Sequence, residues 1–528
     1  MPRCNAVDTD CKIIRRESEP TSVWSFLARK FGNVYKGGKQ MTKSTIGNYS
    51  VAGFGAPPDD PMDWNQLDWK TISKEVLRLQ TRIAKAVREG RWNRVKALQH
   101  LLTHSLNAKL LAVKRVTENK GRRTAGVDGK VWSTPLSKLK AALTLRQRGY
   151  RAQPLRRVHI PKSNGKLRPL GIPTMLDRAM QSLWQMALDP IAETRGDPNS
   201  YGFRPKRSTA DAIEQCFCML AKRHSPKWVL EADIKSCFDR IDHRWLIDHI
   251  PMDQVILSKW LKAGFMEKGR LFPTEAGTPQ GGIASPILAN MALDGLEAAV
   301  RESVAPVNSN RKPAMAHVIR YADDFIVTGV SKELLEERVK PAIQRFLSVR
   351  GLELSPEKTK ITHITEGFDF LGQNVRMYGR KLLITPAKKS VKSVLQKVQE
   401  ILNANRTATQ SRVIMLLNPV IRGWAMYHRH VVSSKIFSDI DHFVFKKLWA
   451  WARRRHPHKG ALWIKRRYFA RIGNRDWIFA CRTSHRRNSF TQFRAETVMI
   501  RRHTKIRGRA NPYDPEWKQY FQKRANAA

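Results

Sequence analysis

Three aspartates carry the strongest chemical signal in the sequence. Asp323 and Asp324 are adjacent and interrupt an apolar, β-rich run over 319–327, a pattern that predicts a tight hairpin with both acids at its tip. Asp233 ends a second apolar run at 228–233. Like charges placed together among apolar residues are costly unless a cation neutralises them. The three carboxylates therefore predict a cation site at the ends of neighbouring strands.

Such a set of carboxylates is typical of phosphoryl transfer. Three carboxylates on neighbouring strands can hold two Mg²⁺ ions about 3.5 to 4 Å apart, an arrangement that activates an attacking hydroxyl and stabilises the leaving oxygen. Hard oxygen ligands favour Mg²⁺ over zinc. Taken alone, two adjacent aspartates in a turn are more often structural than catalytic, so the rest of the chain must decide between these interpretations.

The segments that must position these acids alternate between strand and helix. Over 155–375, short β-rich runs stand between helical stretches, which indicates an α+β core. Before it, the apolar spacing from 69 to 120 is helical and is broken at Gly90, so a small basic helical region is expected. After Pro386 the helical pattern returns. Helices are expected near 388–404, 408–429 and 434–455.

The composition indicates a folded protein that binds a polyanion. The 528 residues include 96 Lys and Arg against 45 Asp and Glu, a formal charge of +51, yet 41% are hydrophobic and 15 are tryptophans. This content excludes a disordered polybasic chain, and Lys and Arg in such excess neutralise phosphates. No run approaches the roughly 20 apolar residues that span a bilayer, so we expect an intracellular protein with no membrane partner. A basic ribosomal-type or membrane-surface protein is the alternative, which the carboxylate pattern disfavours.

The carboxyl-terminal part is strongly basic. Residues 441–528 contain 23 Lys and Arg against 5 Asp and Glu, with five tryptophans among them, a combination suited to a phosphate backbone and stacked bases. A solvated helix face with core tryptophans is the alternative for any single residue there. The six cysteines include no Cys-x-x-Cys pair, so we expect reduced thiols and no zinc ribbon.

Eight segments of the chain carry a further signal when taken in order. They are 160–173, 177–181, 201–205 (Tyr-Gly-Phe-Arg-Pro), 233–238, 277–282 with 285–286, 321–324 (Tyr-Ala-Asp-Asp), 351–352 with 358–360, and 368–372. Together these segments resemble the sequence blocks of group II intron-encoded proteins, which are reverse transcriptases with an RNA-splicing maturase region. The resemblance covers nearly everything from about residue 62 onward. Any one block is a weak signal, but eight in the expected order make accidental similarity very improbable.

This resemblance implies an RNA-directed DNA polymerase that uses two Mg²⁺ ions and dNTP substrates. Asp233, Asp323 and Asp324 would be its catalytic acids. They would also bind the metals, with Ile234 in the same metal set.

The resemblance also implies a nucleotide-binding set. Lys166 and Arg168 would clamp the incoming triphosphate from a basic turn, since a guanidinium and an ammonium both suit phosphate oxygens. Phe238 would face the sugar and select deoxynucleotides. Gln280, in a glycine-rich segment, would approach the nucleotide or the template. Each residue taken alone has a structural alternative. Lys166 and Arg168 could be surface charges, Phe238 could pack in the core, and Gln280 could lie in a plain loop.

Nucleic-acid contacts are expected farther along the chain. Lys358 would lie near the primer or the phosphates. Arg422 falls in the helical stretch that resembles the family's thumb, or maturase X region, which would grip the duplex and the intron RNA. Arg501, Arg502 and Lys505 fall in a segment that resembles the DNA-binding D region.

The expected architecture is a right-hand polymerase of the α+β class, with fingers, palm and thumb, an N-terminal helical extension and a basic C-terminal DNA-binding region. The chain resembles bacterial members that lack the His-Asn-His endonuclease domain, so second-strand cleavage is not expected. The expected parts are a flexible leader (1–61), the helical extension (62–154), the reverse transcriptase fingers and palm (155–384), the thumb or maturase domain (385–455) and the basic D region (456–528).

The expected function is to bind group II intron RNA, promote its splicing and copy it into cDNA during target-primed retrohoming. Its partners would be that RNA, the target DNA, an RNA template and a DNA primer, in a cytoplasmic ribonucleoprotein that acts at the nucleoid. Two alternatives remain open: a splicing cofactor without polymerase activity, and a related reverse transcriptase used in defence or repair. The sequence leaves the oligomeric state open, a monomer on the RNA included.

Overall fold

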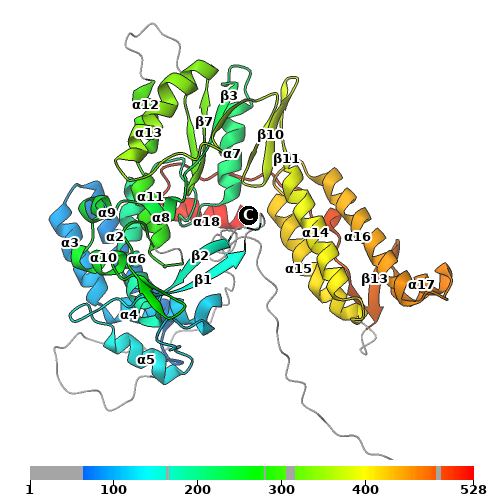
Figure 1. Cartoon of the computed structure of the whole chain (residues 1–528), viewed down its shortest axis with the longest axis horizontal. Coiled ribbons are helices and arrows are strands. Elements are labelled where there is room, and N and C mark those ends of the chain that lie inside the picture. The colour runs from blue at the N-terminus through cyan, green and yellow to red at the C-terminus, as the bar shows by residue number, and fades with distance from the viewer. Residues whose placement is uncertain are drawn as a thin grey trace, which may run out of the picture. The chain divides into compact units, whose positions relative to one another are not determined.

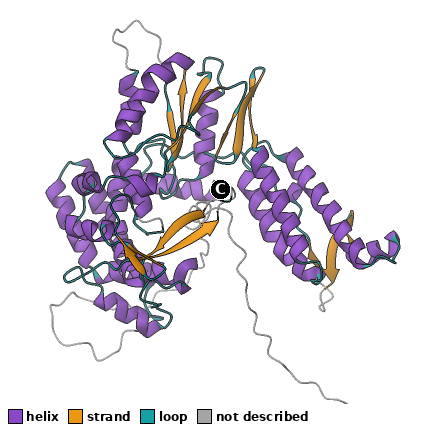
Figure 2. Ribbon diagram, in the orientation of Figure 1, coloured by secondary structure: helices purple, strands orange, loops and turns teal. Residues whose placement is uncertain are grey.

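The computed structural model describes residues 63–527 apart from 162–164, 166, 279–280, 305–314 and 483–488. The leader expected over 1–61 and the predicted residues Lys166 and Gln280 lie outside the described residues. Helices and sheets alternate along the described chain, as Figures 1 and 2 show, which confirms the α+β class. None of the described helices is long and apolar enough to cross a membrane.

The first described part is a group of helices around one long helix. Apolar residues of α2 (Trp69–Arg88) recur at helical spacing and are buried, as the sequence pattern predicts. The helices α2, α3 (Trp92–His104) and α4 (Leu106–Thr117) all contact α6 (Met175–Arg195). Most residues of α6 are buried. Shorter helices of this part and the next are η1 (Lys120–Arg123), α5 (Pro135–Thr144), α9 (His243–His249) and α10 (Gln254–Leu261).

Two four-stranded sheets follow. The first has the order β2-β1-β4-β5, in which β1 and β2 form an antiparallel hairpin. The second has the order β6-β7-β3-β8, and all its neighbours are antiparallel. The strands of the first are β1 (Leu155–Pro161), β2 (Leu167–Ile172), β4 (Phe265–Glu267) and β5 (Arg270–Phe272). Those of the second are β3 (Trp228–Asp233), β6 (Val318–Tyr321), β7 (Asp324–Gly329) and β8 (Lys360–His363).

The second sheet packs against helices. Residues of α7 (Thr209–Leu220) share a buried core with Val229, Ile319 and Ile326 of the sheet, while α12 contacts β6, and η2 contacts β3 and β7. Other helices around this sheet are α8 (Cys237–Arg240), α11 (Ser285–Leu293), α12 (Leu296–Ser303), η2 (Leu334–Val339) and α13 (Lys340–Ser348).

A small antiparallel sheet leads into a helical bundle. Its strands are β9 (Phe368–Phe370), β10 (Gln373–Tyr378) and β11 (Lys381–Pro386). The three helices expected after Pro386 are present as α14 (Lys388–Ala404), α15 (Gln410–His428) and α16 (Ser434–Arg455). They share one apolar core, in which Val398, Leu417 and Phe437 are buried.

The basic stretch over 456–528 divides between two cores. Tyr468, Phe469 and Phe479 are buried in the core of the α14–α16 bundle. Ile506 and Ala510 instead belong to the core of α7 and the second sheet. The elements of this stretch are α17 (Ala461–Tyr468), β12 (Phe469–Ile472), β13 (Arg475–Arg482), β14 (Ser489–Thr491), η3 (Ala495–Thr497), η4 (Pro515–Trp517) and α18 (Lys518–Ala527).

Candidate active site

The three predicted acids come together at one end of the second sheet. Asp233, the last residue of β3, is the direct cross-strand partner of Asp324, the first residue of β7. Tyr321 of β6 also pairs with Asp324, which leaves Ala322 and Asp323 as the turn between the two strands. The hairpin with both acids at its tip is therefore confirmed. Cβ atoms of directly opposed residues in an antiparallel pair lie about 4.5 to 5.5 Å apart.

The electrostatics of these acids favour a bound cation. Burial and, to a smaller extent, the negative charges of Asp323 and Asp233 together raise the pKa of Asp324 to about 7. Burial also raises the pKa of Asp323, with the charge of Asp233 adding to the shift, while the positive charges of Arg168 and Lys358 oppose it. Carboxylates with raised pKa values are stabilised in the ionised form by a nearby positive charge.

A lysine supplies the nearest positive charge. Nζ of Lys358 lies 2.7 Å from Oδ2 of Asp233, in a hydrogen-bonded ion pair. The lysine is predominantly exposed, whereas the carboxylate is mostly covered. This ion pair places a positive charge on one carboxylate of the set. The expected contact of Lys358 with the primer or the phosphates stays a prediction.

The three carboxylates are suitable ligands for a hard divalent cation, although their side chains are not grouped as a complete coordination site. Among the described residues, no three or more His, Cys, Asp or Glu side chains are grouped closely enough to hold a metal ion. Oxygen donors of carboxylates are the ligands that Mg²⁺ prefers. Ile234 is buried beside Asp233 and bridges to Leu354. The hydrogen bonds of that bridge use the Asp233 carbonyl and the Lys235 amide, not the carbonyl of Ile234.

A buried arginine holds the turn that carries the acids. Arg320 of β6 is 1% exposed. Its guanidinium donates to Oδ1 of Asn290 at 3.1 Å, to the carbonyl of Ala322 at 3.4 Å and to Oδ1 of Asp294 at 2.6 Å. An arginine buried with a carboxylate and carbonyl partners is fixed in place, because losing either partner leaves an uncompensated buried group. From the sequence, Arg320 was given no role. A charged residue inside an otherwise apolar strand is nevertheless unusual, and it could have indicated a buried, partnered arginine.

The segment that contains Gly202 lies directly against the same turn. The amide of Tyr201 donates to the Arg320 carbonyl at 2.8 Å, and Nδ2 of Asn290 donates to the Gly202 carbonyl at 2.8 Å. A Cβ atom at position 202 would lie 2.4 Å from the backbone nitrogen of Ala322. Only glycine therefore fits there without moving the turn.

Two of the predicted nucleotide residues, Phe238 and Arg168, are among the described residues. Phe238, in α8, is 5% exposed and meets Phe203 edge-on with ring centroids 6.5 Å apart. Gly277 packs on the backbone of the same helix, since a Cβ there would be 2.5 Å from the Phe238 carbonyl. The amide of Thr278 donates to that carbonyl at 2.6 Å. Arg168, in β2, is close enough to affect the pKa of Asp323. Their roles toward a nucleotide stay predictions.

One of the residues predicted to contact nucleic acid from the basic stretch has a protein partner. Arg502 forms an ion pair with Glu214 of α7 at 3.0 Å. Asp211 of the same helix is fully buried and accepts from His503 and Arg524, at 2.9 and 2.6 Å. These contacts dock the terminal segment on α7. Arg501 and Lys505 lie in that segment, and the guanidinium of Arg422 stands over the ring of Phe493 at 4.8 Å. Among the described residues, none of these contacts reaches the three aspartates.

Three consecutive parts of the chain match known families. Residues 64–145 match the N-terminal domain of reverse transcriptase, residues 160–375 match reverse transcriptase (RNA-dependent DNA polymerase), and residues 391–469 match the group II intron maturase-specific domain.

Several curated proteins resemble the chain in sequence. Protein YkfC of Escherichia coli K12 is 34% identical over 328 residues, which span 53% of this chain and 83% of YkfC. The group II intron-encoded protein LtrA of Lactococcus lactis subsp. cremoris is 32% identical over 333 residues, which span 51% of this chain but only 54% of LtrA. Among solved structures, telomerase from Candida albicans aligns with a TM-score of 0.35 at 15% identity, over 57% of this chain and 59% of that one.

Proposed function

The chain belongs to the family of group II intron-encoded reverse transcriptases, and from that premise we propose that it copies RNA into DNA at the site of Asp233, Asp323 and Asp324. The observation that carries this proposal is the cross-strand pairing of Asp233 with Asp324 beside the Asp323 turn. It supports a site in which buried carboxylates require a cation. Reverse transcriptase domains generally use divalent metal ions and dNTPs.

Asp233, Asp323 and Asp324 would hold two Mg²⁺ ions. Bound there, the ions would activate the primer 3′-hydroxyl and stabilise the oxygen of the departing pyrophosphate. A cation at the site would lower the pKa of Asp324, whose carboxyl would then release its proton to solvent. Lys358, which pairs with Asp233, would offset one negative charge before substrate arrives and would contact phosphate once the ions are bound.

Other residues orient the nucleotide and the turn. Arg168 binds the triphosphate, because a guanidinium can donate to two phosphate oxygens at once. Phe238 packs against the sugar and excludes a 2′-hydroxyl, so that deoxynucleotides are preferred. Arg320 and Gly202 are positioning residues, since they touch the turn and not the substrate. Their fixed contacts keep Asp323 in place through the reaction.

The RNA-binding part of the proposal rests on the maturase-specific match over 391–469. We propose that α14–α16 and the strands packed on them bind group II intron RNA, assist its splicing and hold the template during target-primed synthesis. The formal charge of +51 implies many phosphate contacts, so RNA affinity should fall steeply with salt. A splicing cofactor would share this binding and lack synthesis, whereas a related enzyme of defence or repair would synthesise DNA without a cognate intron.

The test is Mg²⁺-dependent extension of a DNA primer on an RNA template, beside a splicing assay with the intron RNA. Asp323→Asn should abolish extension and leave RNA binding and splicing intact, because the change removes one charge and little volume. Asp248→Asn is the matched control, since Asp248 is exposed and its ion pair with Arg244 is long, at 4.0 Å. Extension by Asp323→Asn at the native rate would refute the site. Absence of extension by the native protein, with splicing retained, would instead favour the splicing cofactor.

A further inference from the structure

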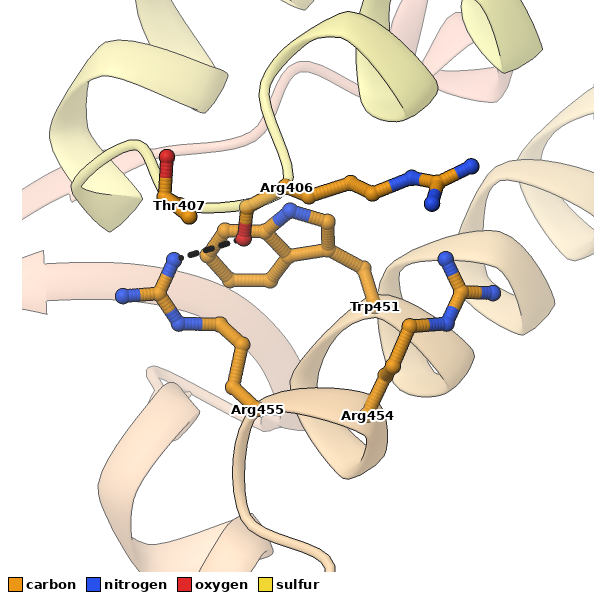
Figure 3. A pocket seen from close by; sticks show the side chains of 5 residues that line it. All are labelled: Arg406, Thr407, Trp451, Arg454 and Arg455. Atoms are coloured by element: carbon orange, nitrogen blue, oxygen red, sulfur yellow. Dashed lines mark hydrogen bonds between the residues drawn. The ribbon is translucent and has the colours of Figure 1, made fainter.

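A basic pocket opens in the helical bundle at the end of α16. Figure 3 shows it, with Arg406 and Thr407 from the loop between α14 and α15 on one side, and residues near the C-terminus of α16 on the other. Its volume is about 360 Å³, within the range of small-ligand sites. The residues that line it are Arg406, Thr407, Trp451, Arg454 and Arg455.

The loop that forms one wall is held rigidly. The guanidinium of Arg455 donates to the carbonyls of Arg406 and Ala408, at 3.0 and 2.7 Å. Nε1 of Trp451 donates to the carbonyl of Asn405 at 3.0 Å. The Arg455 guanidinium also stands over the Trp451 ring at 4.6 Å. The backbone of this loop is therefore set before any ligand arrives, which lowers the entropy cost of binding.

Two other guanidinium groups face the pocket. Arg406 and Arg454 are exposed, and Figure 3 shows both side chains extending on the same side of the Trp451 ring. Within the described part of the chain, neither guanidinium has an ion pair, and no carboxylate lines the pocket. Cations are favoured at a helix C-terminus, which accounts for the position of Arg455 and in part for that of Arg454. It does not explain Arg406, which comes from a separate loop.

The chemistry of the pocket selects an anion over a base. Trp451 is 3% exposed and is covered by Arg455, so its ring offers no face for stacking. The available donors are the guanidinium groups of Arg406 and Arg454 and the hydroxyl of Thr407. Guanidinium groups donate to pairs of phosphate oxygens. A tetrahedral, singly charged phosphodiester matches this donor set.

We propose that this pocket binds a backbone phosphate of the RNA, and this rests on the proposed function of the maturase-specific part. The pocket lies within residues 391–469, which match that domain. Arg406 and Arg454 grip the phosphate, while Trp451 and Arg455 hold the loop. The site anchors RNA to the bundle and takes no part in the chemistry at the aspartates.

The test compares Arg406→Gln/Arg454→Gln with Lys389→Gln/Arg453→Gln. Both pairs remove two exposed charges from α14–α16 and their loop, but only the first pair lines the pocket. The dissociation constant for structured intron RNA is measured over a range of salt concentrations. The pocket variant should bind about tenfold more weakly or worse, and its salt dependence should fall by roughly one phosphate contact. The control should change much less.

Further arms separate this proposal from its competitors. Primer extension by the native protein is measured in parallel, and its absence would count against the proposed function and not against the pocket. Equal RNA affinity in the two variants would overturn the pocket. If the pocket variant lost as much affinity for duplex DNA as for RNA, the proposal would also be overturned, because the two arginines would then act only through their positive charge. If added dNTP displaced RNA from the native protein but not from the pocket variant, the pocket would be a nucleotide site and the proposal would be wrong.

Discussion

Replacing Gly202 with alanine should slow catalysis and leave the protein folded. The glycine lies against the turn between β6 and β7 that carries Asp323. The three nearest atoms to an added Cβ are the Ala322 nitrogen, the Tyr321 carbonyl carbon and the Ala322 Cα, at 2.4, 2.9 and 3.1 Å. All three are backbone atoms, so no flexible side chain can yield to the methyl group.

The size of the effect follows from these distances. Ordinary van der Waals contact begins at 3.4 Å, so the backbone at Ala322 must move by about 1 Å. Asp323 is the next residue and moves with it. A displacement of about 1 Å at a reacting group can cost roughly 100-fold in rate, while overpacking costs about 1 to 3 kcal/mol of stability. We therefore expect kcat to fall about 100-fold in a protein that still folds.

The assay is steady-state primer extension on an RNA template, with thermal unfolding measured in parallel. kcat should fall far more than the KM for primer–template rises, because the helical bundle is untouched. Gly460→Ala is the control, since a Cβ there meets nothing within 4 Å and the backbone has an ordinary φ of −67°. A native kcat in Gly202→Ala would refute the positioning of the turn by this contact. Complete loss of folding would refute it as well.

Three further predictions concern single side chains. Burial lowers the pKa of His428 to about 3. Between pH 7 and pH 5 the unfolded chain therefore gains a proton at this histidine that the folded chain does not bind. The free energy of unfolding, measured by thermal unfolding, should fall by about 2 kcal/mol over this range, and by less in His428→Gln. Phe238→Ala should weaken discrimination against ribonucleotides by about tenfold or more, measured as the ratio of kcat/KM for dNTP and rNTP; an unchanged ratio would remove Phe238 from sugar selection. Lys358→Met should lower the Mg²⁺ concentration for half-maximal extension, because no ammonium then competes for Asp233; an unchanged Mg²⁺ requirement would contradict that competition.

Local pattern was enough to locate the acids and their strands. The apolar run over 228–233 coincides with β3, and the Asp323–Asp324 interruption marks the turn after β6. Both signals come from neighbouring residues, since β-rich composition and a polar break define a strand and its end. The helices after Pro386 follow in the same way from apolar periodicity.

Contacts between distant segments could not be read from local pattern. Lys358 reaches Asp233, and Arg320 reaches Asn290 and Asp294, only because the chain folds back on itself. Gly202 is one glycine among 30, and nothing beside it in sequence indicates the turn that it touches. Such residues are found by their burial and their partners, which exist only in the folded protein.

Charge counts were least informative where cations have acidic partners. The excess of Lys and Arg over 441–528 predicts a nucleic-acid surface, but Arg502 pairs with Glu214 and Arg524 with Asp211. Those acids lie on α7, almost 300 residues or more away in sequence. Composition sums the charges of a segment and does not show which of them a fold neutralises. DNA binding by this segment stays a prediction.

The most direct test of the central claim is metal binding at the three aspartates. Mn²⁺ would replace Mg²⁺, and bound ions would be counted by electron paramagnetic resonance in the presence of RNA template, DNA primer and a non-hydrolysable dNTP. We predict two bound ions in the native protein and a loss of at least one in Asp324→Asn, with RNA affinity unchanged. Equal numbers of ions, held with equal affinity in both proteins, would contradict the account.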